Sequence, residues 1–291
     1  MSVVHQLGQR LFSAINQVAA PPSPFVAGQP GRGKVVAVAA QKGGVGKTTS
    51  AVHLAAGLAE RHRLRVLLID LDAQGHVASS LRAHLRGAAA TSVSAVLLGQ
   101  ETELLAATVA TSVEGLYATA ADKKLAETEG QLATKIGREM LLARALKSAR
   151  QAYDVVVIDC PPNLGLLTLN ALCAADHVLV PCDLSVLSLE GVDALVQTLQ
   201  TLEWSFGRAP QLLGLLHTRV DKRNQKQNAA IRRAVAQRYA GLPLHSEIAT
   251  NTAVSAAQLH GQTVFAAAPD STGARDYAAL ADEIHGKLFA R

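Results

Sequence analysis

The chain has 291 residues, of which 49% are hydrophobic and 18% charged, and its net charge is +5. That length allows one large domain or two small ones, and the composition is typical of a globular protein with a large core. No apolar run approaches the roughly 18–20 residues of a membrane-spanning helix, and the first residues lack the continuous apolar stretch of a secretory signal. We therefore expect a cytoplasmic protein.

The three cysteines are Cys160, Cys173 and Cys182. They show no paired spacing of the kind found in metal sites, and three thiols cannot form a full set of disulfides. We interpret all three as small hydrophobic residues buried in the core.

The N-terminus is expected to stand apart from the rest of the chain. Residues 21–33, PPSPFVAGQPGRG, are rich in Pro and Gly and are predicted to be a linker to a domain at 34–291. Residues 1–20 are predicted to contain an amphipathic helix, whose apolar positions are Val3, Leu7, Leu11, Ile15 and Val18. This helix could pack on its own domain or in a dimer, bind a partner, or touch a membrane.

From Lys34 onward, short β-rich runs alternate with longer helical stretches. Several predicted strands are apolar throughout, as expected for parallel strands covered on both faces; the strands are 35–40, 65–70, 115–120, 154–159, 177–182 and 212–217. Helices are predicted at 48–62, 134–151 and 189–202, with a closing helix that carries Tyr277, Leu280, Ile284 and Leu288. The alternation predicts an α/β fold with a doubly wound, mostly parallel sheet flanked by helices.

The strongest chemical signal is a glycine-rich turn between a predicted strand and helix. Glycines at 43, 44 and 46 allow several backbone N–H groups to point at one anion, and the helix N-terminus adds partial positive charge. Lys47 supplies a cation for the β- and γ-phosphates, and the Thr48 hydroxyl suits Mg²⁺. The predicted nucleotide-binding residues of this turn are Gly43, Gly44, Val45, Gly46, Lys47, Thr48 and Thr49.

This turn departs from the ordinary P-loop in one respect, and the departure points to a family. Gln41 stands where an ordinary P-loop has glycine, and Lys42 beside it is a second lysine. The resulting KGGVGKTT motif resembles that of the ParA/MinD family of deviant-Walker ATPases, and specifically its ParA branch. The resemblance covers nearly the whole chain after the linker and implies ATP hydrolysis with ATP and Mg²⁺ as cofactors.

Three further segments carry the same resemblance. The stretch VLLIDLDAQGH (66–76) is similar to switch I of the family, and YDVVVIDCPPNLG (153–165) to its Walker B and switch II. The stretch GLLHTRVDKRN (214–224) is similar to the strand end and loop beside the adenine, which adds Thr218 and Arg219 to the expected nucleotide contacts. In this family Asp72 would orient the attacking water, Asp70 would sit near the metal, and Asp159 would hold Mg²⁺ through water.

These acidic roles also have a physical basis. Asp70, Asp72 and Asp159 all lie at or just past the carboxyl ends of predicted parallel strands, where open sheets bind ligands. Phosphoryl transfer needs a metal, a positioned water and cations at the phosphates, with little covalent chemistry. The resemblance adds that Lys42 reaches across a dimer to the partner's nucleotide, so that the expected catalytic residues are Lys42, Lys47 and Asp72.

A basic segment suggests a nucleic-acid partner. Residues 208–238 contain eight Lys or Arg and one acidic residue, Asp221, so the segment carries +7 while the rest of the chain sums to −2. Without interleaved aromatics, such a segment suits the phosphate backbone better than base readout, although it could also be a solvated face. The expected DNA-binding residues are Arg219, Lys222, Arg223, Lys226, Arg232 and Arg233, and the resemblance implies nonspecific DNA and a nucleoid-associated location.

The expected function is therefore an ATP-dependent homodimer that binds nonspecific DNA and positions a cargo, with a partner protein stimulating hydrolysis. Two alternatives remain: a MinD-like, membrane-cycling ATPase, or a nucleotide-gated scaffold with negligible turnover. The C-terminus lacks the basic amphipathic anchor of MinD-like proteins, so a membrane partner is not expected. Thr250, Ser255, Ala73 and His76 depart from the ParA pattern and leave the partner's identity open.

Overall fold

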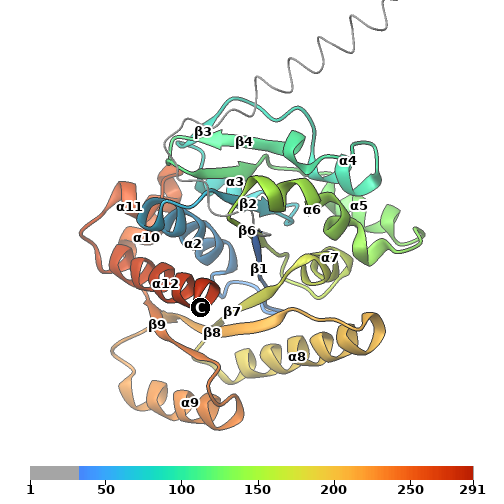
Figure 1. The fold of residues 1–291 in the computed structure, drawn as a ribbon. Helices are drawn as coiled ribbons and strands as arrows, with labels where there is room; N and C mark the ends of the chain where they lie inside the picture. Colours follow the sequence, from blue (N-terminus) through green and yellow to red (C-terminus); the bar gives the residue numbers. More distant parts are fainter. Residues whose placement is uncertain (1–32, 291) are drawn as a thin grey trace, which may run out of the picture. The chain divides into compact units, whose positions relative to one another are not determined.

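The computed structural model describes residues 33–290 (Figure 1). The predicted N-terminal helix in residues 1–20 and the linker at 21–33, apart from Gly33, lie outside the described residues. From Gly33 onward, the chain builds one sheet with helices on both faces.

Within the described residues, the sheet has nine strands in the order β3-β4-β5-β2-β6-β1-β7-β8-β9. Their bounds are Lys34–Val38 (β1), Val66–Asp70 (β2), Leu85–Arg86 (β3), Thr108–Thr111 (β4), Leu116–Thr119 (β5), Val155–Asp159 (β6), His177–Asp183 (β7), Gln211–Val220 (β8) and Pro243–Ala249 (β9). Pairing is parallel from β5 through β9, whereas β4 is antiparallel to β5 and β3 to β4. The predicted doubly wound, mostly parallel α/β fold is confirmed.

Two helical layers cover this sheet, one on each face (Figure 1). One face carries α2 (Lys47–His62), α3 (His76–Ser80), α10 (Thr252–His260), α11 (Val264–Ala267) and α12 (Thr272–Phe289). The other carries α4 (Val93–Leu98), α5 (Leu125–Leu132), α6 (Leu141–Ala152), α7 (Leu166–Ala174), α8 (Val186–Phe206) and α9 (Gln225–Arg238), with 3₁₀ turns at Leu104–Ala107 and Arg138–Met140. No described helix is both long and apolar enough to cross a membrane.

The central strands are apolar because both of their faces are buried. Every residue of β2 and β6 is buried, and alternate side chains of β1 enter the two cores on opposite faces of the sheet. In β1, Val35 and Ala37 join one core while Val36 and Val38 join the other. This arrangement leaves polar groups only at the strand ends, where the functional loops emerge.

The structure differs from the sequence prediction in three places. The helix predicted at 134–151 begins only at Leu141, because Gly137 adopts a left-handed conformation (φ 66°) and a 3₁₀ turn follows it. Strands β3 and β4 were not predicted, since two and four residues are too short for a periodic signal. Strand β9 was also missed because its burial does not alternate regularly.

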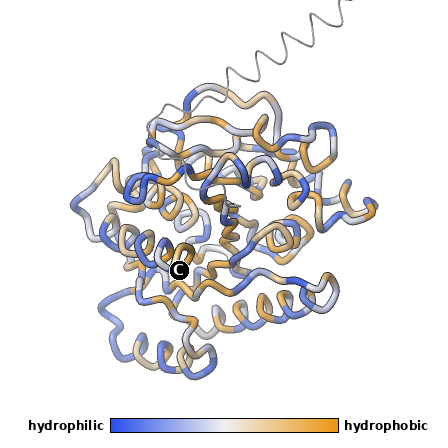
Figure 2. Tube along the Cα trace, viewed as in Figure 1, coloured by the Kyte–Doolittle hydropathy of each residue, from blue (hydrophilic) through white to orange (hydrophobic). Residues whose placement is uncertain are grey.

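Helix α9 is the most polar helix of the second layer (Figure 2). Among its residues only Asn228 and Val235 are buried, whereas α7 buries seven of its nine residues. Most of the α9 surface therefore faces water.

Candidate nucleotide site

The glycine-rich turn lies between the end of β1 and the start of α2, as the sequence predicts. Gly44 (φ 75°) and Gly46 (φ 81°) both take left-handed conformations that other residues seldom adopt, and Gly46 is the N-cap of α2. The first helical residue is Lys47, which is 7% exposed and donates from Nζ to the Lys42 carbonyl oxygen over 3.0 Å. Burial lowers the pKa of Lys47, while the charge of Asp159 acts in the opposite direction.

Two residues at the carboxyl end of β8 form hydrogen bonds to this turn. Thr218, only 2% exposed, donates from Oγ1 to the Val45 carbonyl over 2.7 Å. Arg219 donates from its guanidinium to the Gly44 carbonyl over 2.9 Å, and it does so from a left-handed backbone conformation (φ 52°). Because both carbonyls accept hydrogen bonds from β8, the conformation of the turn is fixed before an anion binds.

The structure brings Asp70 and Asp159 together as register partners at the ends of β2 and β6. Asp159 is fully buried, and neither of its carboxylate oxygens accepts a well-formed hydrogen bond from a described residue. Burial, with a smaller contribution from Asp70, raises its pKa well above the usual value, while Thr48 and Lys47 oppose the shift. A carboxylate with both oxygens unpartnered beside the Thr48 hydroxyl fits Mg²⁺, which favours oxygen ligands.

Asp70 has a different environment. Its Oδ1 accepts from the Asp72 backbone N–H over 2.9 Å, and its Oδ2 accepts from the Val77 N–H over 3.2 Å. Burial nevertheless raises its pKa to about 7. Asp70 therefore organises the loop that presents Asp72, whose own Oδ1 accepts from the Gln74 N–H over 3.0 Å. Sequence reasoning placed Asp70 near the metal but missed this supporting contact with the loop.

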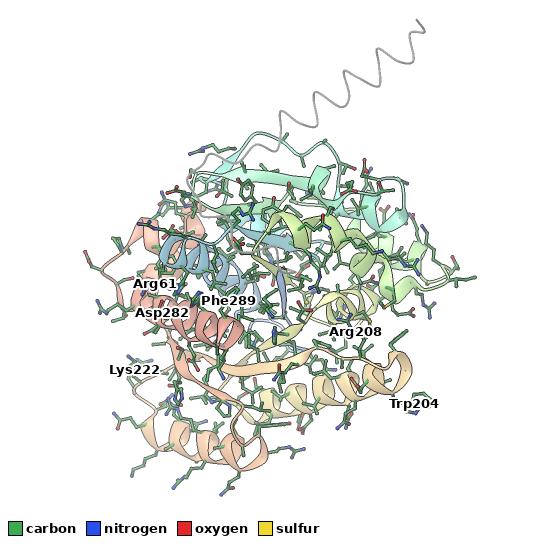
Figure 3. The ribbon with its side chains drawn as sticks, viewed as in Figure 1. Arg61, Trp204, Arg208, Lys222, Asp282 and Phe289 are labelled. Atoms are coloured by element: carbon green, nitrogen blue, oxygen red, sulfur yellow. The ribbon has the colours of Figure 1, made fainter. Side chains whose placement is uncertain are left out.

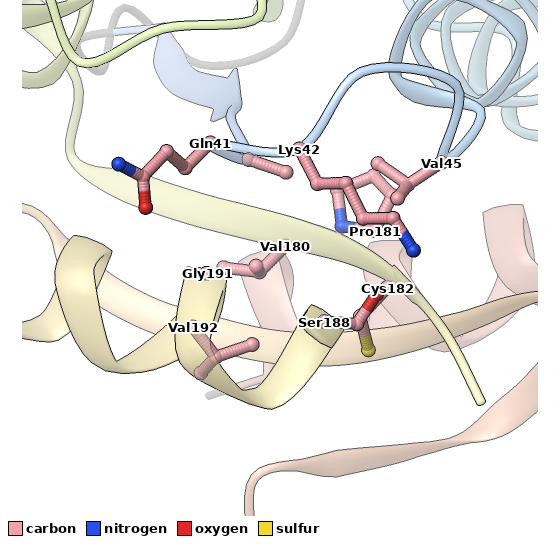
Figure 4. A pocket seen from close by; sticks show the side chains of 10 residues that line it. Gln41, Lys42, Val45, Val180, Pro181, Cys182, Ser188, Gly191 and Val192 are labelled. Carbon is pink, nitrogen blue, oxygen red and sulfur yellow. The ribbon is translucent and has the colours of Figure 1, made fainter. Parts of the chain in front are cut away.

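Lys42 points away from the turn and contacts the end of β7. Its Nζ donates to Asp183 Oδ2 over 2.8 Å and to Ser185 Oγ over 3.2 Å. Figure 4 shows its side chain reaching across β7 toward Cys182 and Ser188, beside a cavity of about 10 Å³ that has room for roughly one water molecule. Sequence reasoning missed Asp183, although it too lies at the carboxyl end of a parallel strand.

The predicted DNA-binding residues do not form a uniform patch. Arg232 donates two 2.6 Å hydrogen bonds to the Glu247 carboxylate, and Arg223 forms an ion pair with Asp221. Arg219 is engaged by the P-loop, as described above. Within residues 33–290, the exposed candidates that have neither an ion pair nor a contact with the P-loop are Lys222, Lys226 and Arg233.

The basic segment is also divided between two ends of β8. Arg208 precedes the strand and donates to the Ala175 carbonyl over 3.2 Å, whereas Lys222 follows it. Ten residues of strand span about 30 Å, and Figure 3 shows Lys222 at the left edge of the molecule and Arg208 to the right of its centre. The positive charge counted along 208–238 is therefore concentrated around the loop after β8 and around α9, without Arg208.

Comparisons with known proteins identify the family of this chain. The AAA domain family matches residues 33–209. Sporulation initiation inhibitor protein Soj of Bacillus subtilis (strain 168) is 36% identical over 252 residues, which are 87% of this chain and 98% of Soj. The chain belongs to the ParA-like family of P-loop ATPases. It is an ATPase, and ATP with Mg²⁺ is the cofactor pair of this family.

A further relative and two solved structures are also similar to this chain. The chromosome-partitioning ATPase Soj of Treponema pallidum is 33% identical over 87% of this chain and 97% of its own. A structure described as cobyrinic acid a,c-diamide synthase from Mycobacterium smegmatis, with bound ADP and magnesium, is 36% identical, covers 89% of this chain and 96% of that one, and has a TM-score of 0.73. MinD from Pyrococcus horikoshii, with Mg-ADP, matches in fold at 22% identity and a TM-score of 0.71, over 88% of this chain and 97% of that one.

Proposed function

We propose that this ParA-like ATPase is a dimer switch, in which ATP joins two subunits and hydrolysis separates them. The single observation that carries the proposal is the convergence of the P-loop, buried Asp159 and Asp72 at one edge of the sheet, with a second lysine, Lys42, at the rim. Lys42 Nζ is bound to Asp183 and Ser185, and its cation becomes available to a neighbouring subunit once these contacts open.

Within this switch, each group has one task. The N–H groups of residues 43–49 and the cation of Lys47 bind the phosphates. Thr48 and Asp159 would hold Mg²⁺, which would supply positive charge against the phosphates. Asp72, on the loop that Asp70 organises, orients the attacking water. Lys42 of the second subunit supplies a cation where transition-state charge develops.

The dimer binds DNA without sequence preference. The loop after β8 and the exposed side of α9 present Lys222, Lys226 and Arg233, which suit phosphates more than base edges. Dimerisation doubles these contacts, so the affinity for DNA follows the nucleotide state. The relatives named for chromosome partitioning support a role in positioning a cargo such as a chromosome, plasmid or protein assembly. In this role a partner protein stimulates hydrolysis, and the protein acts in the cytoplasm on the nucleoid.

The solved structure described as a diamide synthase offers a second candidate, ATP-dependent amide formation. An amide synthase that takes ammonia from glutamine uses a nucleophilic thiolate. Here the three cysteines are buried, and burial raises the pKa of Cys160, of Cys173 to about 11 and of Cys182 to about 12. None is a reactive thiolate at neutral pH, so the chain's own chemistry favours the switch.

Molar mass in solution tests the proposal. We expect light scattering to give a dimer with ATP and Mg²⁺ in the Asp72→Ala variant, which binds but does not hydrolyse, and a smaller species with ADP. A mass that is the same with ATP, ADP and no nucleotide contradicts the switch. A stable ATP dimer whose turnover neither DNA nor any partner accelerates would instead favour the nucleotide-gated scaffold.

A further inference from the structure

Lys42 is held within its own chain by a small polar cluster at the junction of β7 and α8. Its Nζ lies 2.8 Å from Asp183 Oδ2 and 3.2 Å from Ser185 Oγ. The side chains of Lys42 and Asp183 are 33% and 26% exposed, so water screens the pair only in part. We propose that Asp183 is a positioning residue that holds Lys42 in cis until the nucleotide of a second subunit displaces it.

The carboxylate of Asp183 is fixed in place before Lys42 arrives. Its Oδ1 accepts hydrogen bonds from the hydroxyls of Ser185, over 2.6 Å, and Ser188. Ser185 is also the N-cap of α8 and accepts from the Ser188 backbone N–H over 3.3 Å. Because β7 and the first turn of α8 both hold it, the carboxylate cannot follow Lys42 toward another site.

Asp183 is also ionised at neutral pH. Partial burial opposes its charge, but the hydrogen bonds from Lys42, Ser185 and Ser188 outweigh burial and keep its pKa below the usual value. A fixed anion and a phosphate therefore compete for one lysine. The competition has a direction, because the phosphates of a second subunit's ATP approach Lys42 only when the two subunits meet.

The inference rests on the proposed dimer, in which Lys42 acts across the interface. Forming one dimer requires two Lys42–Asp183 pairs to open, one in each subunit. If the Lys42–Asp183 pair lowers the population of subunits with a released Lys42 by a factor f, the dissociation constant of the dimer rises by f squared. A factor of 3, typical of a partly exposed ion pair, thus becomes about 10-fold for the dimer.

A double-mutant cycle in the nucleotide-free chain tests whether the pair exists. Asp183→Asn, Lys42→Ala and the double variant are unfolded in urea, and the coupling between the two changes is measured. We expect a coupling of about 3- to 10-fold in the unfolding equilibrium constant. Strictly additive effects would overturn the inference, whatever the dimer does.

Dimerisation with a non-hydrolysable ATP analogue and Mg²⁺ tests what the pair does. We expect Asp183→Asn to tighten the dimer about 10-fold, and Asp183→Glu, which restores the charge, to return toward wild type. The matched control is Asp282→Asn, which removes an exposed ion pair with Arg61 (Figure 3). Arg61 lies in the last turn of α2, at the opposite end of that helix from the P-loop, so dimerisation should be unchanged. Unchanged or weaker dimerisation in Asp183→Asn overturns the holding role.

The two readouts separate failure of this inference from failure of the proposed function. If wild type forms no dimer with the analogue, the dimer switch is wrong. The urea cycle still reports whether Asp183 holds Lys42. If the dimer forms and the cycle shows no coupling, the switch stands and the holding role is wrong.

Discussion

At the scale of single residues, the site is defined by charges that folding places in unfavourable surroundings. Asp159 is fully buried with neither oxygen partnered by a described residue, and Lys47 is almost fully buried. Such groups destabilise the nucleotide-free fold unless a cation or an anion binds them. Mg²⁺ and phosphate carry the opposite charges, so their binding would offset the cost of burying Asp159 and Lys47.

This cost predicts a dependence of stability on pH. Burial raises the folded-state pKa of Asp159, and of Asp70 to about 7, so both bind protons more tightly in the folded chain than in the unfolded chain. Their contribution to the free energy of unfolding is complete below about pH 4 and is lost as pH rises to about 7 and beyond. For one such group, the loss between pH 5 and pH 8 is on the order of 2 kcal/mol.

Asp159→Asn isolates this effect. In nucleotide-free urea unfolding, we expect the variant to lose less unfolding free energy than wild type between pH 5 and pH 8, because its side chain no longer titrates. Asp221→Asn is the matched control, since Asp221 is only partly buried and its hydrogen bonds with Arg223 lower its pKa to about 2, outside this range. Equal pH slopes in wild type and Asp159→Asn would contradict the account.

A second residue-scale prediction concerns Thr218. Its buried hydroxyl donates to the Val45 carbonyl, so Thr218→Val removes this hydrogen bond while keeping the side-chain shape. We expect ATP to bind about 5- to 10-fold more weakly, corresponding to roughly 1 kcal/mol for one buried hydrogen bond. Thr218→Ser keeps the hydroxyl and should bind ATP nearly as wild type does in calorimetry. Equal affinity for both variants would show that the hydroxyl does not hold the turn.

At the scale of elements, β8 connects the two proposed binding surfaces. Its carboxyl end fastens the P-loop through Thr218 and Arg219, and the following loop and α9 carry the exposed basic residues. Counting charge along the sequence identified the region but could not tell which arginines the fold already uses. Arg232 is paired with Glu247, which lies 15 residues further along the chain on β9, a strand that the sequence did not predict.

The salt dependence of DNA binding tests whether the exposed basic residues of this region contact DNA. We expect the triple variant Lys222→Ala, Lys226→Ala and Arg233→Ala to reduce the slope of log affinity against log salt, measured with ATP, by about 3 per subunit. Arg208→Ala is the matched control, because Arg208 lies at the opposite end of β8 and should leave the slope unchanged. A larger loss in Arg208→Ala than in the triple variant would place the DNA elsewhere.

The elements themselves were predictable where burial is continuous. Strands β1, β2, β5, β6, β7 and β8 and helices α2 and α8 lie close to their predicted positions, because long apolar runs and a helical period leave few alternatives. The prediction failed where one residue overrode the pattern, as Gly137 does before α6, and at the short edge strands. The P-loop was predictable because its glycines are needed for the turn itself.

At the scale of the whole molecule, ATP is the proposed link between two subunits. The sequence indicated which residues meet at the nucleotide, but not that Lys42 is occupied by Asp183, since that contact joins residues 141 positions apart. Such a pairing has no local signal. It is visible only when β1 and β7 are placed side by side in the sheet.

Turnover in two variants tests the link. We expect Lys42→Ala to bind ATP with nearly wild-type affinity but to lose most hydrolysis, because the cation supplied by the second subunit is missing. Asp72→Ala should also lose hydrolysis but should accumulate as the ATP dimer. Steady-state phosphate release and light scattering measure both properties. Normal turnover by Lys42→Ala would show that this lysine does not act across the interface.

The most direct measurement of the central claim is binding to a random-sequence DNA duplex, titrated with salt, in ATP, in ADP and without nucleotide. The account predicts tight, salt-sensitive binding with ATP alone, because only the dimer doubles the basic contacts. Binding of equal strength in all three conditions, or no binding in any, would contradict the proposed coupling between the nucleotide site and α9.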